Sequence, residues 1–243
     1  MELTVLGCGD AFGSGGRNHT SFLIVENNEG VLLDCGASTL IRLKHEGIAL
    51  DSISTIVISH FHGDHFGGIP FFLISSLFEN PRNAPLAIVG PKGVKKRVLE
   101  LQEAMYAGTA EKLIDLDLSF IEYSQGEPTV LDDKVIKAWE VDHSPPSMPH
   151  GIRLEWNGKK IAFSGDTSWS ENLIPLSRGT DLFICECNFQ NVVSFGHLSY
   201  SELLEKKVQF DTKALWLTHM ADEVFEASDF VLNRLADGQK ISI

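Results

Sequence analysis

The sequence predicts one α/β domain over residues 1–243, in which β-sheets pack together and helices lie outside. Short apolar runs bounded by Gly, Pro, Asn and Asp recur along the chain, as strands do. Segments with helical spacing follow strand runs twice, and no internal repeat or low-complexity linker interrupts them. With 43% hydrophobic residues, 243 residues suffice for a buried core.

The strand pattern is strongest where β-branched and aromatic residues cluster between turn residues. Strands are expected at 3–7, 21–26, 30–36, 54–60, 86–91, 134–141, 150–166 (a hairpin), 181–187 and 214–220. In the late hairpin, Asn157-Gly158 favours the positive φ angles of a tight turn. In the first hairpin, the stretch "ENNEG" supplies the turn.

Helical periodicity predicts four helices, at residues 38–48, 93–108, 199–209 and 226–238. Pro91 and Gly93 mark the start of the second helix. Ser199 followed by Glu202 forms a capping-box pattern at the start of the third, because each side chain can bind the other's backbone N–H.

The chain is acidic, with 20 basic and 33 acidic residues and a formal charge of −13. Binding of long nucleic acid draws its affinity from clustered Lys and Arg, so this composition disfavours a polynucleotide surface. A small phosphate ester remains compatible, because bound divalent cations would offset the negative charge locally.

The four cysteines, Cys8, Cys35, Cys185 and Cys187, are too few and too scattered for a disulfide scaffold, so reduced thiols are expected. Cys185 and Cys187 are interpreted as ordinary strand residues. No basic start precedes a long apolar stretch at the N-terminus, and no window reaches the roughly 18 apolar residues of a membrane span. These features predict a cytoplasmic protein without a membrane partner.

The stretch "ISHFHGDHFGG", residues 58–68, places His60, His62, Asp64 and His65 within six positions after an apolar run. Crowded imidazoles and carboxylates resist burial unless they share a cation. The cluster therefore predicts a metal-binding loop.

Three further metal-competent residues follow later strands: His143, Asp166 and His219. Taken singly, each is more typical of a turn or a satisfied polar group. As a set, ligands from several strand ends converge on one rim of a sheet, where rigid elements support a site.

The motif "HFHGDH" resembles the His-x-His-x-Asp-His motif of the metallo-β-lactamase fold superfamily, and "LLDCG", "VDHSPP", "FSGDT" and "LTHM" follow in that family's arrangement. The resemblance implies an αββα sandwich of two packed mixed sheets flanked by helices. It also implies two metal ions, the first held by His60, His62 and His143, the second by Asp64, His65 and His219, with Asp166 bridging them.

Imidazole and carboxylate ligands suit zinc, with Mn²⁺ or Fe²⁺ as possible substitutes. Two such ions can share a hydroxide whose pKa lies near neutrality. By the same resemblance, Asp34 lies behind the loop and would hold the other N–H of a ligand imidazole. The alternative for Asp34 is a turn residue at a strand end.

Two further stretches are similar to the ribonuclease Z group: "GDAFGSGGRNHTSFLI" at 9–24 and "FGHLSYSEL" at 195–203. In that group, the histidine matching His197 faces the scissile phosphate, and the acidic residue matching Glu186 pairs with it. Asp64, His197 and Glu186 are accordingly assigned as catalytic residues. The alternatives are a helix-entry histidine and a strand-end glutamate.

One departure concerns the extended arm by which many bacterial members grip tRNA, inserted between the lone histidine and the bridging aspartate. Here only "SPPSMPHGIRLEWNGKKIAFSG" separates His143 from Asp166, enough for a short loop and one hairpin. Residues 71–112 also lack a basic glycine-rich tip. Endonucleolytic processing of tRNA 3′ ends therefore ranks second.

The expected function is hydrolysis of a small or cyclic phosphodiester by attack of a metal-bridging hydroxide. Residues 143–151, "HSPPSMPHG", are expected to form part of the substrate mouth, where Met148 or His150 could touch the substrate. Rival hypotheses are a lactone, thioester or β-lactam hydrolase and a non-enzymatic ligand-binding sensor of the same fold. The resemblance also implies a homodimer.

Overall fold

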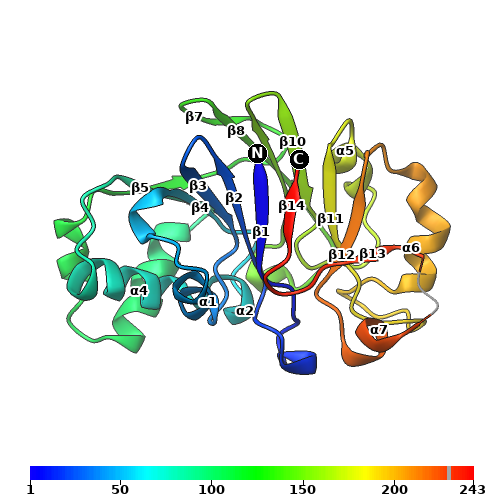
Figure 1. Cartoon of the computed structure of the whole chain (residues 1–243), viewed down its shortest axis with the longest axis horizontal. Helices are drawn as coiled ribbons and strands as arrows, with labels where there is room; N and C mark the ends of the chain where they lie inside the picture. The colour runs from blue at the N-terminus through cyan, green and yellow to red at the C-terminus, as the bar shows by residue number, and fades with distance from the viewer. Residues whose placement is uncertain (229–230) are drawn as a thin grey trace. The chain divides into compact units, whose positions relative to one another are not determined.

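The computed structural model describes residues 1–228 and 231–243 (Figure 1). Internal contacts divide the chain into two compact units, each containing one seven-stranded mixed sheet. The first unit comprises Met1–Gly7, Asn18–Glu122 and Asp237–Ser242, and the second comprises Cys8–Arg17, Tyr123–Ala236 and Ile243. A single domain over residues 1–243 stays a prediction.

The sheet of the first unit has the strand order β14-β1-β2-β3-β4-β5-β6. Its strands are β1 Glu2–Gly7, β2 Ser21–Glu26, β3 Glu29–Leu33, β4 Ile53–Val57, β5 Leu86–Gly90, β6 Leu118–Glu122 and β14 Lys240–Ser242. Pairing is antiparallel from β14 to β3 and parallel from β3 to β6. The red β14 lies beside the blue β1 in Figure 1, so the two ends of the chain close one edge of this sheet.

The helices of the first unit follow its parallel strands. They are α1 Thr39–His45, α2 Gly63–Phe66, α3 Ile69–Ile74 and α4 Val94–Met105, with short 3-10 or π segments at Leu50–Ser52, Ser75–Glu79 and Glu111–Asp115. Fully buried Leu32, Ile56 and Phe72 belong to one apolar cluster that joins the sheet to these helices. Burial of this surface is the main stabilising contribution to the unit.

The sheet of the second unit has the order β13-β12-β11-β10-β9-β8-β7. Its strands are β7 Thr129–Leu131, β8 Lys134–Glu140, β9 His150–Trp156, β10 Lys159–Phe163, β11 Leu182–Glu186, β12 Leu215–Thr218 and β13 Asn233–Arg234. Pairing is antiparallel from β7 to β10 and parallel from β10 to β13. Strands β10, β11 and β12 therefore end at the same edge.

The helices of the second unit are α5 Leu173–Ser177, α6 Tyr200–Lys206 and α7 Asp222–Glu226, with 3-10 segments at Ser14–Gly16, Pro145–Ser147 and Lys207–Gln209. Phe183, Leu203 and Leu217 belong to its apolar core. At the start of α6, Ser199 Oγ accepts a hydrogen bond from the Glu202 N–H at 3.4 Å, which confirms the predicted cap.

The predicted turns are confirmed by their backbone angles. Asn157 and Gly158 have φ values of 46° and 77°, and Asn27 and Asn28 have φ values of 51° and 66°. Asparagine and glycine adopt this left-handed region more readily than other residues. The paired strands on either side, β9 with β10 and β2 with β3, match the expected hairpins.

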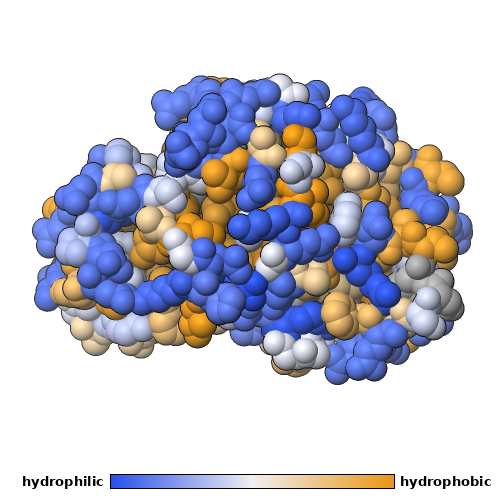
Figure 2. Space-filling view, viewed as in Figure 1, coloured by the Kyte–Doolittle hydropathy of each residue, from blue (hydrophilic) through white to orange (hydrophobic). Residues whose placement is uncertain are grey.

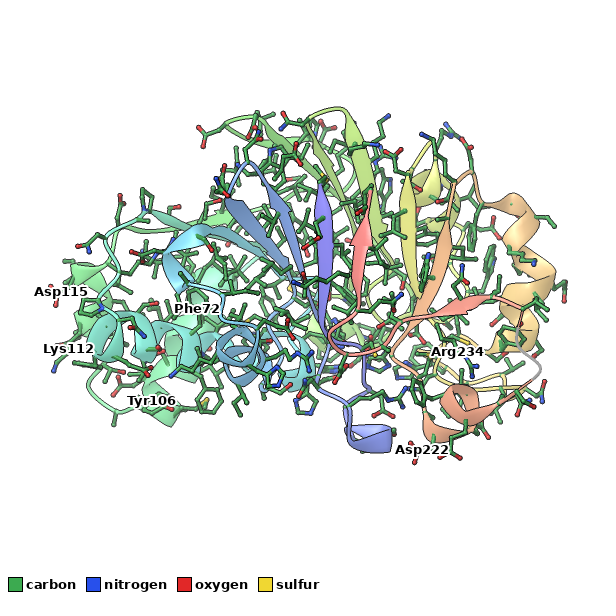
Figure 3. All side chains as sticks on the ribbon, in the orientation of Figure 1. Phe72, Tyr106, Lys112, Asp115, Asp222 and Arg234 are labelled. Carbon is green, nitrogen blue, oxygen red and sulfur yellow. The ribbon has the colours of Figure 1, made fainter. Side chains whose placement is uncertain are left out.

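The predicted helix at 226–238 is wrong where the structure describes it. Helix α7 ends at Glu226, and β13 pairs with β12 in parallel. Asp229 and Phe230 lie outside the described residues. Arg234 Nη1 donates to the backbone carbonyls of Val224 and Phe225, which ties β13 to α7 instead of continuing a helix (Figure 3). Strands β6, β7 and β14 were not predicted, and none of their residues is buried.

Hydrophilic side chains cover much of the face seen in Figure 2, in keeping with the charge of −13. None of the helices in the described part of the chain has the length and apolar character that crossing a membrane requires. All four cysteines are buried thiols outside any disulfide, as expected from the sequence. Burial raises the pKa of the Cys35 thiol to about 12, so this thiol is a packing group rather than a nucleophile.

Candidate metal centre and catalytic pair

In the first unit, the loop after β4 gathers the four residues of the "HFHGDH" motif. His60 Nε2 lies 3.2 Å from His62 Nδ1, and His65 Nε2 lies 3.1 Å from Asp64 Oδ2. The rings of His60 and His65 have centroids 4.1 Å apart. Three imidazoles and a carboxylate thus present nitrogen and oxygen donors within a few ångströms, as divalent cations require.

Asp34 holds this loop through hydrogen bonds to Ser59 and His65, as the family resemblance implies. Its carboxylate is fully buried and accepts hydrogen bonds from the Ser59 N–H and the Ser59 hydroxyl, each at 2.7 Å. Asp34 Oδ2 lies 2.6 Å from His65 Nδ1. Burial raises the pKa of Asp34, and the hydrogen bond with His65 opposes that rise. The arrangement holds the proton of His65 on Nδ1 and leaves Nε2 as the donor for a metal.

A glycine is needed where the loop meets the end of β3. A Cβ on Gly36 would lie 2.3 Å from the carbonyl oxygen of Asp64 and 2.6 Å from His19 Cβ. Such contacts leave no room for a side chain, so Gly36 permits the close backbone approach that positions Asp64.

In the second unit, His143, Asp166 and His219 come together from the ends of β8, β10 and β12. Asp166 Oδ2 lies 3.3 Å from His219 Nε2 and 3.8 Å from His143 Nε2. His143 Nδ1 donates to the carbonyl of Gly196 at 2.7 Å, which directs Nε2 toward Asp166. The prediction that these strand-end residues converge is confirmed within this unit.

The backbone of His219 is in the left-handed region, with φ 54°, a conformation that the surroundings must hold. Its N–H donates to the Cys8 carbonyl at 3.0 Å, and its carbonyl accepts from Asn188 Nδ2 at 3.0 Å. Arg17 Nη2 donates to the carbonyl of Met220 at 2.5 Å. The sequence interpretation missed Asn188; Arg17 stood in the "RNHTS" stretch, but its contact could not be assigned.

The fully buried Glu186 and the partly exposed His197 form a hydrogen-bonded pair next to these residues. Glu186 Oε1 accepts from His197 Nδ1 at 3.0 Å and from the Thr167 N–H at 2.6 Å, and Oε2 accepts from the Leu198 N–H at 3.1 Å. Both oxygens of Glu186 thus accept hydrogen bonds, which fixes the carboxylate and, through it, the ring of His197. Burial raises the pKa of Glu186, while the hydrogen bond from His197 lowers it.

The ring of His197 stacks on His219, with centroids 5.3 Å apart, and meets His143 edge-on at 4.9 Å. Its side chain is 23% exposed, whereas that of Glu186 is 0% exposed. Gly196, just before it, has φ 90°, and a Cβ there would lie 2.8 Å from His143 Nδ1. The Gly-His-Leu-Ser element therefore needs glycine both for its backbone angle and for contact with His143.

A cavity of about 480 Å³ adjoins His143. Its lining comes chiefly from the segment predicted as the substrate mouth and comprises Glu140, Val141, Asp142, His143, Pro145, Met148, Pro149, His150 and Phe195. His150 Nδ1 donates to the Met148 carbonyl at 2.8 Å, and its ring meets Tyr123 edge-on. Residues 143–151 thus line a cavity of the second unit, and their role as a substrate mouth stays a prediction.

The donor sets in both units fit divalent metal ions. Each offers imidazole nitrogens beside a carboxylate oxygen, and His65 and His143 have the second ring nitrogen engaged by an acceptor. This is the arrangement that orients a metal-binding imidazole.

Comparison with known proteins identifies related enzymes. Ribonuclease Z of Lachnoclostridium phytofermentans is 24% identical over 283 aligned residues, which cover 95% of this chain and 91% of that protein. Ribonuclease Z of Methanothermobacter thermautotrophicus is 29% identical and covers 91% of this chain and 87% of that protein.

Solved structures confirm the fold. The short form of human tRNase Z superposes with a TM-score of 0.78 at 23% identity, covering 100% of this chain and 99% of that chain. A diphosphatase from the PhnP family gives the same TM-score at 17% identity, covering 100% and 97%. The predicted metallo-β-lactamase-like αββα fold and the ribonuclease Z-like resemblance are confirmed.

The predicted class, a metal-dependent hydrolase of the phosphodiesterase or ribonuclease Z type that binds divalent metal, is also confirmed at this level. A family model described as anti-Pycsar protein Apyc1 matches residues 1–233, nearly the whole chain. The chain therefore belongs to the anti-Pycsar protein Apyc1 family.

Proposed function

We propose that this chain is a binuclear metal-dependent phosphodiesterase that hydrolyses a small or cyclic phosphodiester. The observation that supports this most directly is the Glu186–His197 pair, with His197 packed on both His143 and His219. A histidine held by a buried carboxylate beside metal-ligand candidates suits phosphate chemistry, whereas lactone or lactam hydrolysis has no need of it.

The proposed metal ligands are those expected from the sequence. His60, His62 and His143 would hold one ion, Asp64, His65 and His219 would hold the other, and Asp166 would be shared. The donors of each unit, with the second nitrogens of His65 and His143 already engaged, support this assignment. Zinc is the proposed metal because imidazole nitrogens and carboxylate oxygens are common ligands of catalytic zinc in proteins.

The bound ions would supply an activated water as nucleophile and neutralise the charge of the phosphate. His197 would donate a proton to the leaving oxygen or stabilise the charge that develops on the phosphoryl group. Glu186 accepts from His197 Nδ1, so the other ring nitrogen, Nε2, is the one available for the substrate. Thr167 follows Asp166 directly, so its hydrogen bond to Glu186 also links His197 to the shared carboxylate.

A compact substrate is proposed because no tRNA-gripping arm is present in residues 143–166, all of which the structure describes. That stretch contains only the 3-10 turn Pro145–Ser147 and the β9–β10 hairpin. The alignment with the ribonuclease Z of L. phytofermentans spans 283 positions, so at least 40 of them have no counterpart among the 243 residues here. The charge of −13 also disfavours tRNA.

The second candidate is endonucleolytic processing of tRNA 3′ ends, which is favoured by the name of the curated relatives, ribonuclease Z. Cleavage of a precursor tRNA at its 3′ end, at a rate exceeding that for cyclic phosphodiesters, would establish this function instead.

A homodimer is proposed from the family resemblance and is tested by light scattering.

The first experiment measures hydrolysis of bis(p-nitrophenyl) phosphate by zinc-loaded protein, alongside a lactone, a thioester and nitrocefin. His197→Ala and Asp166→Ala should each lose diester turnover by at least about 100-fold. His45→Ala is the matched control, because its side chain is 73% exposed on α1 and pairs with the neighbouring Glu46. Hydrolysis of the lactone, the thioester or nitrocefin without hydrolysis of the diester would refute the proposal.

A further inference from the structure

Asn188 contacts the proposed ligand His219 in a way that sets this histidine apart from other proposed ligands. Asn188 lies two residues past β11 and is 7% exposed, and His219 follows β12 and is 2% exposed. The Nδ2 atom of Asn188 lies 3.0 Å from the carbonyl oxygen of His219 and 3.2 Å from its ring nitrogen Nδ1. One buried amide group therefore faces both the backbone and the ring of the same histidine.

The contact with the carbonyl decides which way the amide of Asn188 is turned. A backbone carbonyl only accepts hydrogen bonds, so the group that faces it is the NH₂ of the amide and not its oxygen. The same NH₂ faces His219 Nδ1. Because an amide NH₂ only donates, Nδ1 must accept, and the proton of the neutral ring lies on Nε2. Asp166 Oδ2, at 3.3 Å from Nε2, is placed to accept from that proton.

In the first unit, two proposed ligands have the opposite arrangement. His65 Nδ1 lies 2.6 Å from the carboxylate of Asp34. His60 Nδ1 lies 3.0 Å from Ser59 Oγ, whose own proton is donated to Asp34, so this hydroxyl accepts from His60. Both rings therefore carry their proton on Nδ1 and keep on Nε2 the lone pair that a metal ion needs.

In the second unit, His143 follows the same pattern and His219 does not. His143 Nδ1 donates to the Gly196 carbonyl at 2.7 Å. Neutral His219 can offer Nε2 to a metal ion only after its proton has moved to Nδ1, where that proton meets the NH₂ of Asn188. Either this contact is lost, or the amide turns and brings its oxygen against the His219 carbonyl. Each outcome removes a favourable buried hydrogen bond, so metal binding through His219 is opposed.

We infer that Asn188 is a positioning residue that opposes metal binding by His219, so that the centre loads in two steps and the ion bound through His219 is the weaker and exchangeable one. This inference rests on the proposed metal ligands and adds a regulatory property to them, because occupancy of the second step follows the zinc available to the protein. The only chemical change is the movement of one proton within the imidazole, from Nε2 to Nδ1.

The first test locates the ring proton of His219 in the metal-free protein. Proton–nitrogen correlation spectra of the imidazole rings distinguish the two neutral forms by their nitrogen chemical shifts. The signals of His219 are assigned by their loss in His219→Asn, since asparagine tolerates the left-handed backbone at this position, where φ is 54°. We expect the proton on Nε2 of His219 and on Nδ1 of His143. A proton on Nδ1 of His219 would overturn the inference.

The second test measures zinc affinity by competition with a chelator. The wild-type protein should bind zinc in a tight step and a weaker step, and His219→Asn should abolish only the weaker one. Asn188→Ser should tighten the weaker step about tenfold, because a hydroxyl can donate to the His219 carbonyl and accept from Nδ1–H at the same time. Loss of the tighter step in His219→Asn, or an unchanged or weakened second step in Asn188→Ser, would overturn the inference.

Asn172→Ser is the matched control. Asn172 Nδ2 also donates to a backbone carbonyl, that of Glu140 at 2.8 Å, so the same substitution there should leave both zinc affinities unchanged. An equal gain in Asn172→Ser would overturn the inference, because the gain would then not depend on His219. If the wild-type protein binds no zinc, the proposed function fails, and the position of the His219 proton still decides the role of Asn188.

Discussion

Asp34→Asn is the substitution that most directly tests how the proposed metal-binding loop is held. The wild-type carboxylate receives three donors: the Ser59 N–H and hydroxyl, each at 2.7 Å, and His65 Nδ1 at 2.6 Å. Asparagine keeps the shape and tolerates the left-handed backbone at this position, where φ is 59°. Any effect therefore comes from replacing one acceptor oxygen with an NH₂ group and from losing the negative charge that interacts with His65.

The amide can be placed in two ways, and each has a definite consequence. If its NH₂ faces His65, Nδ1 must become an acceptor, and the proton moves to Nε2, the nitrogen proposed to bind metal. If its NH₂ faces the Ser59 N–H, a buried donor loses its acceptor, which costs about 1–3 kcal/mol of the free energy of unfolding. In the first arrangement metal affinity should fall about 10- to 100-fold, as it does when partners of ligand histidines are altered.

The assay pairs urea denaturation of the metal-free protein with zinc titration against a chelator. Asp132→Asn is the matched control, because Asp132 also has a left-handed backbone, φ 50°, but lies exposed in a turn. Unchanged zinc affinity and unchanged stability in Asp34→Asn would refute the reasoning. Lost stability with unchanged zinc affinity would limit Asp34 to holding Ser59.

Three further predictions concern other parts of the chain. Gly36→Ala should lower the free energy of unfolding, measured by urea denaturation, by about 1–3 kcal/mol. Gly63→Ala is the control and should be nearly neutral, because a Cβ on Gly63 would meet nothing within 4 Å. Similar losses for both variants would contradict the packing argument. Burial lowers the pKa of His150 below 6.5, so the unfolded chain binds its proton more readily, and stability should fall as pH drops below about 6.5. His150→Gln should flatten that slope in denaturation curves between pH 5 and 7, and an unchanged slope would show that other groups set it. Arg17→Met removes the donor to the Met220 carbonyl and should weaken zinc binding about tenfold in chelator competition; wild-type affinity would leave Arg17 a purely structural residue.

Much of the candidate site could be predicted because its candidate ligands belong to recognisable short sequence patterns. His60, His62, Asp64 and His65 lie within six positions, and His143, Asp166 and His219 each follow an apolar strand. Strand periodicity and turn residues depend on near neighbours, so they can be interpreted without the fold. The cap at Ser199 was predictable for the same reason.

Other features depended on contacts between distant parts of the chain. Asn188 binds the carbonyl of His219, 31 positions away, and Arg17 binds that of Met220, 203 positions away. No local pattern distinguishes such side chains from ordinary polar residues. The helix predicted at 226–238 failed in the same way, because pairing of β13 with β12 outweighed a helical pattern.

By itself, the sequence determined the donors of the proposed metal centre, the positions of most strands along the chain and the histidine expected to face the phosphate. Only the tertiary structure decided that both oxygens of Glu186 accept hydrogen bonds from backbone N–H groups and His197, that the Gly196 carbonyl accepts from His143, and that Glu140 and Asp142 line the adjoining cavity. The physical reason is that the local sequence determines which side chains and backbone conformations are available, whereas packing determines which of them come into contact. Hydrogen bonds form only between groups that packing brings into contact.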